Sequence, residues 1–160
     1  MTLSTGYLTQ TQKTIWDLKN TGLNESGIAR KLCVTRQTVH KALDIANSKV
    51  LESLKETAKI NNIKIESVDP LTGVLVGYSV HFKTQALITF SAKNGIRTWY
   101  KHEGDCKKCE QSQICKQTLL EEAKERNLQL PNNIESILPS EFANILFIKL
   151  LGEKIHEKTD

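Results

Sequence analysis

Residues 25–46 decide the fold of the N-terminal part of the chain, and they read ESGIARKLCVTRQTVHKALDIA. Apolar residues recur in this stretch at the three- and four-residue spacing of amphipathic helices. Asn24 and Thr35 stand where N-caps are needed, because their side-chain oxygens can accept hydrogen bonds from the first free backbone N–H groups of a helix. The stretch therefore predicts one helix over about 25–32, a turn at Cys33-Val34, and a second helix from 36 onward.

The flanking sequence predicts a third helix before this pair and a long continuation after it. Ile15, Trp16 and Leu18 indicate a helix over about 9–20. No Gly or Pro occurs from 35 to 62, so the helix that begins at 36 can continue through this stretch, with or without a break near Asn47. Its apolar stripe can pack on the next domain or on the same helix of a second copy, and comprises Val39, Leu43, Ala46, Val50 and Leu54.

The stretch closely resembles a helix-turn-helix, and residues 7–50 together resemble the trihelical units of LuxR-type regulators, of region 4 in bacterial sigma factors, and of archaeal Tfx-like regulators. The resemblance implies that Ala29 allows the two helices to cross closely, with Ile28, Leu32, Val34, Val39 and Ala42 as apolar contacts. Cys33 departs from the family pattern, which usually has Gly at a left-handed turn residue. Gly27 is a second departure, inside the second helix.

A DNA-binding role follows from this resemblance. In the family, the second helix of the motif lies in the major groove and its first residues contact base edges. By this analogy Arg36 would bind a guanine and Gln37 an adenine, while Arg30, Lys31 and Thr35 would contact phosphates. The expected DNA-binding residues are Arg30, Lys31, Thr35, Arg36, Gln37, Thr38, His40 and Lys41.

The charge distribution is consistent with a phosphate-binding N-terminal part. The 160-residue chain has 22 Lys and Arg against 18 Asp and Glu. Residues 1–62 hold 9 of these cations and 5 of the acids, whereas the rest holds 13 of each, so the excess of +4 lies entirely in 1–62. Such a cluster is the electrostatic footprint of a nucleic-acid binder, although a solvated helix face has the same composition.

The period changes to two after residue 62, which predicts strands at 63–66, 74–82, 86–91 and 96–101 and hence a four-stranded antiparallel meander. Helices are expected over 116–127 and 141–151, with a capping-box turn starting at Asn132. The fold class is therefore α+β. The expected domains are a helix-turn-helix domain over 1–46, a helical linker over 47–62 that can also serve in dimerisation, and an α+β domain over 63–160.

Three of the four cysteines fall within ten residues, at Cys106, Cys109 and Cys115. With His102 as fourth ligand, this cluster predicts a tetrahedral zinc site in the loop 102–115. His81 is an alternative fourth ligand. The Cys spacing also resembles that of iron-sulfur proteins in the RecB-like nuclease group, and a disulfide with no cofactor is a third possibility.

These patterns favour a dimeric, sequence-specific transcriptional regulator that binds double-stranded DNA and whose C-terminal domain binds metal, dimerises or senses. A metal or redox enzyme acting on nucleic acid and an RNA-polymerase-interacting adaptor are the alternatives. No Ser/His/Asp triad, Gly-rich phosphate loop or His-Glu-x-x-His motif is present, so we expect no enzyme. The apolar runs are too short for a membrane span and no signal peptide is visible, which favours a cytoplasmic protein without a membrane partner.

Overall fold

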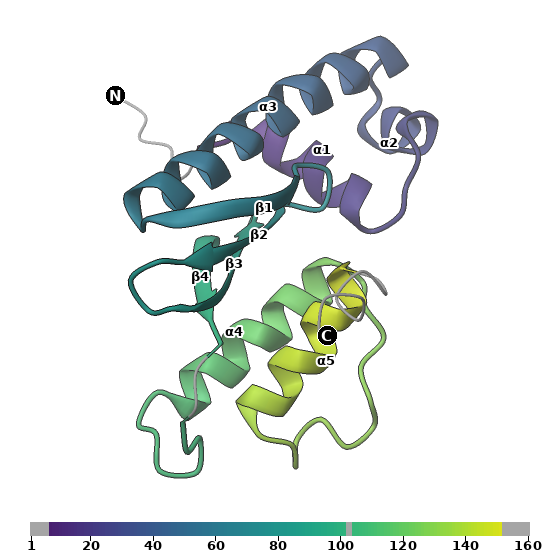
Figure 1. Ribbon diagram of the computed structural model, residues 1–160. Helices are drawn as coiled ribbons and strands as arrows, with labels where there is room; N and C mark the ends of the chain where they lie inside the picture. The colour runs from purple at the N-terminus through teal and green to yellow at the C-terminus, as the bar shows by residue number, and fades with distance from the viewer. Residues whose placement is uncertain (1–6, 102–103, 152–160) are drawn as a thin grey trace, which may run out of the picture. The chain divides into compact units, whose positions relative to one another are not determined.

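The computed structural model describes residues 7–101 and 104–151, which divide into two compact units, 1–102 and 103–160 (Figure 1). The fold is α+β: three N-terminal helices, a four-stranded antiparallel sheet and two C-terminal helices. The helices of the expected DNA-binding domain and the whole sheet belong to the first unit, so the expected boundaries after residues 46 and 62 both fall inside it. No helix within the described ranges is long and apolar enough to cross a membrane.

The three N-terminal helices are α1 (Gln10–Asn20), α2 (Glu25–Leu32) and α3 (Arg36–Ile60). α2 and α3 start directly after the caps predicted at Asn24 and Thr35. Asn24 accepts a hydrogen bond from Gly27 N at 2.8 Å, and Thr35 accepts one from Thr38 N at 3.1 Å. α3 continues without a break through residues 47 and 48. The turn residue Cys33 has φ 54° and ψ 42°, so it adopts the left-handed conformation that Gly reaches at the lowest steric cost.

The three helices enclose a small core at the helix-turn-helix. Ile15, Ile28 and Val39 are fully buried there, and Ala29 and Leu43 nearly so. Val34 does not join this core as expected: the residue is 40% exposed, directly after the left-handed turn residue Cys33.

The sheet is the predicted meander. Its strands are β1 (Ile63–Asp69), β2 (Val74–Ser79), β3 (Thr84–Ser91) and β4 (Gly95–Tyr100), paired in the order β1-β2-β3-β4. β2 ends at Ser79 rather than at Phe82, because the chain turns there and Lys83 adopts a positive φ. Val80 and Phe82 are therefore exposed in the turn rather than aligned on a strand face.

The C-terminal half of α3 lies along one face of the sheet (Figure 1). Val50 and Leu54 are fully buried there against Leu75 and Ile88, and Trp16 of α1 packs edge-to-face on Phe90 with ring centroids 5.1 Å apart. The apolar stripe of α3 therefore passes through two cores of the same chain. It is not available to a second copy, which removes the stripe as an argument for dimerisation.

The second unit contains α4 (Ser112–Glu125) and α5 (Pro139–Leu151), which pack on each other. Both helices begin before the positions expected, so Cys115 lies in α4 rather than in the preceding loop. Residues 132–136 form turns, as expected for the segment that starts at Asn132. Lys116 holds this segment by donating to the carbonyl oxygens of Glu135 at 2.6 Å and Ile137 at 3.0 Å.

Candidate nucleic-acid interface

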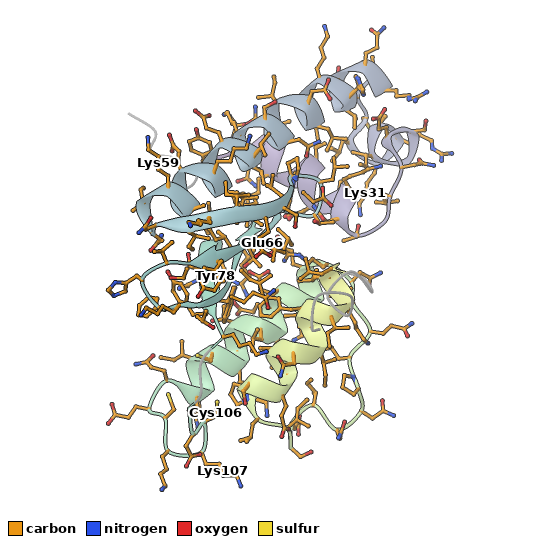
Figure 2. All side chains as sticks on the ribbon, in the orientation of Figure 1. Lys31, Lys59, Glu66, Tyr78, Cys106 and Lys107 are labelled. Atoms are coloured by element: carbon orange, nitrogen blue, oxygen red, sulfur yellow. The ribbon has the colours of Figure 1, made fainter. Side chains whose placement is uncertain are left out.

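The predicted DNA-binding residues lie together around the end of α2 and the first turns of α3, and all eight are exposed. Figure 2 labels Lys31 in this region. The N-terminus of α3 carries the positive end of the helix dipole and no acidic residue in its first turn. This surface is polar and carries the cationic side chains of Arg30, Lys31, Arg36 and Lys41.

A carboxylate that the sequence analysis did not single out organises two of these residues. Glu25, the first residue of α2, accepts from Arg36 Nε at 3.3 Å and lies 3.1 Å from His40 Nδ1. On the other side, His40 Nε2 lies 3.4 Å from Asp44 Oδ2, one helical turn further along α3. We name Glu25, Arg36, His40 and Asp44 the charge chain; it connects α2 to the exposed face of α3.

The charge chain favours the charged form of its central groups. The hydrogen bond to Glu25 and the negative charge of Asp44 raise the pKa of His40. The hydrogen bond to His40, followed by that to Arg36, lowers the pKa of Glu25 against its partial burial. Asp44 could have been found from the sequence, since it lies four residues after His40. Glu25 could not, because its contacts depend on how the two helices cross.

The other predicted DNA-binding residues do not belong to the charge chain. Arg30, Lys31, Gln37 and Lys41 make no side-chain hydrogen bond or ion pair with any described residue. Thr35 is engaged as a helix cap, and its hydroxyl lies 2.8 Å from that of Thr38. The structural role of Thr35 is therefore shown by its contacts, whereas the other four side chains are available to a ligand.

We expect the stability of the helix-turn-helix to depend on pH through His40. A pKa raised above the ordinary value of 6.5 means that the histidine contributes its full stabilisation below pH 6.5 and loses it as the pH rises through the raised pKa. NMR titration of the His40 ring should give a pKa above 6.5, and Glu25→Gln should bring it back down. Glu52→Gln, a change on α3 away from the charge chain, is the matched control. A wild-type His40 that titrates at or below 6.5 would contradict the contact.

The predicted metal ligands lie in the second unit, except for His102, which is outside the described residues. Cys106 and Cys115 are half-buried, Cys109 is exposed, and all three are free thiols (Figure 2 labels Cys106 in the loop before α4). Across the described ranges, no group of three or more His, Cys, Asp or Glu side chains is placed to hold a metal ion. The described residues alone do not assemble a tetrahedral zinc set. His81, the alternative ligand, lies in the β2–β3 turn of the first unit, edge-to-face with Phe82.

The thiols should differ in reactivity. Burial, and then the nearby Cys109 and Cys106, raise the pKa of Cys115, so less of it is the reactive thiolate at neutral pH. We expect iodoacetamide to modify the exposed Cys109 before Cys115, as followed by peptide mass spectrometry. Equal protection of all three, removed by a strong zinc chelator, would show a metal site instead. A pair that reacts only after reduction would show a disulfide.

Comparison with known proteins returns no match, whether with protein-family models, with curated protein sequences or with solved structures. The geometry of this surface is therefore the basis for assigning a function.

Proposed function

We propose that this protein is a sequence-specific regulator of transcription that binds double-stranded DNA as a homodimer, with the first turns of α3 in the major groove. The observation that carries the proposal is that Arg36, Gln37 and Lys41 are exposed at the capped N-terminus of α3. α3 follows α2 through a turn whose residue Cys33 is left-handed, so the two helices form a helix-turn-helix. The eight exposed residues supply both kinds of contact that such a protein needs, to phosphates and to base edges.

In the charge chain, different nitrogens of Arg36 can serve different partners. Arg36 uses Nε for Glu25, which leaves its two terminal nitrogens to donate to a base. The same contact restrains the side chain before DNA arrives, so less conformational entropy is lost on binding. Gln37 and Lys41 lie one turn apart on α3, so they share one face of that helix.

The proposal is tested by selecting binding sites from a library of random DNA duplexes and measuring affinity by fluorescence anisotropy at several salt concentrations. A regulator enriches a consensus and binds it at least about a thousandfold more tightly than unrelated duplex. Uniform binding to every duplex, or no binding, would contradict it. Uniform binding would favour a docking module of an enzyme on nucleic acid, whereas co-purification with RNA polymerase without DNA binding would favour an adaptor.

A homodimer is expected because one helix-turn-helix contacts only a half-site, and two-fold symmetry doubles the contacts on a palindrome. Sedimentation velocity at micromolar concentration should give twice the chain mass of 18.0 kDa. The selected consensus should be an inverted repeat with half-sites about 34–36 Å apart, one turn of DNA. An 18.0 kDa species both free and on DNA would contradict the dimer while leaving the DNA-binding surface intact.

A further inference from the structure

A cleft of about 510 Å³ lies within the first unit, away from the DNA-binding surface. Its walls come from the start of the described chain and α1, from the C-terminal half of α3, and from the β3–β4 turn. Its volume is within the range of about 300–1,000 Å³ that small-molecule sites occupy. Two of its three walls belong to α1 and α3, and α3 also supplies the second helix of the helix-turn-helix at its N-terminal end.

Apolar side chains line the cleft. Leu8 and Phe90 line it and are almost completely buried, and Ile96 is half-buried beside them. Ile60 also lines it, at the end of α3, with 82% of its surface exposed. Because most of the Ile60 side chain is exposed to solvent, a bound ligand could cover it and bury additional apolar area.

Cationic and neutral hydrogen-bond donors line the cleft as well. Lys13 of α1 and Lys93 of the β3–β4 turn line it, opposed by one acid, Glu56. Lys13 is half-buried and makes no ion pair with any described residue. Asn94 lines the cleft as well, and its Nδ2 is buried without a hydrogen-bond partner among the described residues. A buried donor left unpaired costs free energy that an acceptor on a ligand would recover.

We propose that this cleft binds a small amphipathic anion, with an apolar body against Leu8, Phe90 and Ile96 and one anionic group near Lys13 and Asn94. Carboxylates and sulfonates have this chemistry. Ser53 and Thr57 of α3 line the cleft from the same helix whose first turns carry the DNA-binding residues. The second part of this inference rests on the proposed function: the bound anion is an effector of DNA binding. It contacts both α1 and α3, and through α3 it changes the affinity for DNA.

The probe is 8-anilinonaphthalene-1-sulfonate, an aromatic anion whose fluorescence rises in apolar surroundings. We expect saturable binding of one molecule per chain, weakened about tenfold or more by Lys13→Glu, which places a negative charge where the charge-assisted hydrogen bond would form. Lys13→Gln should have a smaller effect in the same direction. Ser53→Leu, which places a larger side chain in the cleft wall, should also weaken binding. The matched control is Lys19→Glu, on an exposed position of α1 outside the cleft.

Thermal melting of each variant establishes that it is folded before its titration is interpreted. Equal affinity of the wild type and all three cleft variants would overturn the proposal, as would equal binding of N-phenyl-1-naphthylamine, which lacks the sulfonate. The effector role is tested separately by adding the probe to the complex with the selected duplex. If the cleft variants weakened probe binding but the protein bound no DNA, the ligand site would stand and the proposed function would be wrong.

Discussion

Replacement of Leu54 by alanine is expected to lower the free energy of unfolding of the first unit by about 2–5 kcal/mol. Leu54 is fully buried where α3 packs on the sheet, so truncation loses its transfer free energy and leaves a cavity that rigid strands cannot fill. Both tryptophans, Trp16 and Trp99, lie in this unit, so denaturation by urea followed by their fluorescence reports on it alone.

The control for this change is Lys55→Ala, the next residue, which is exposed and should alter stability by less than about 0.5 kcal/mol. If Leu54→Ala lowered the free energy of unfolding no more than Lys55→Ala does, the second half of α3 would not be packed on the sheet. The helix-turn-helix and the sheet would then not share a structural unit.

Replacement of Arg36 by alanine is expected to weaken binding to the selected duplex by about 1–3 kcal/mol and to relax the preference at one base pair. Two contacts are expected to disappear together, because the terminal nitrogens no longer reach the base and Glu25 loses one of its two partners, the Arg36 Nε at 3.3 Å, while it keeps His40. Anisotropy titrations on the consensus and on its single-base variants measure both effects.

Lys31→Ala is the informative contrast to Arg36→Ala. Lys31 is exposed at the end of α2 and is expected to contact a phosphate, so its loss should weaken binding to all duplexes alike and reduce the salt slope by about one. Glu25→Ala separates the effect of the Glu25 contact from that of the base contact. This change removes the carboxylate that restrains Arg36, while the guanidinium is still present to bind the base. If Arg36→Ala and Lys31→Ala both bound the consensus like the wild type, α3 would not be the helix in the groove.

Local sequence signals determined where the elements begin. Asn24 and Thr35 specify the starts of α2 and α3, since a cap acts within three residues, and the period of two after residue 62 specifies the four strands. The need for a left-handed residue at Cys33 was also visible, from the resemblance of the turn to a known motif. These features depend on residues close in the chain, which is why the sequence alone was sufficient.

Only the tertiary structure decided which surfaces meet. The α3 stripe was compatible with a second copy or with the next domain, because periodicity defines a face but not its partner; the structure buries it in two cores of the same chain. The same holds for Glu25, which lies 11 and 15 residues from Arg36 and His40. It also holds for the cleft, where Lys13 and Asn94 come from opposite ends of the first unit's sequence. Contacts at such separations depend on helix crossing angles and sheet register, which arise only when the whole core packs.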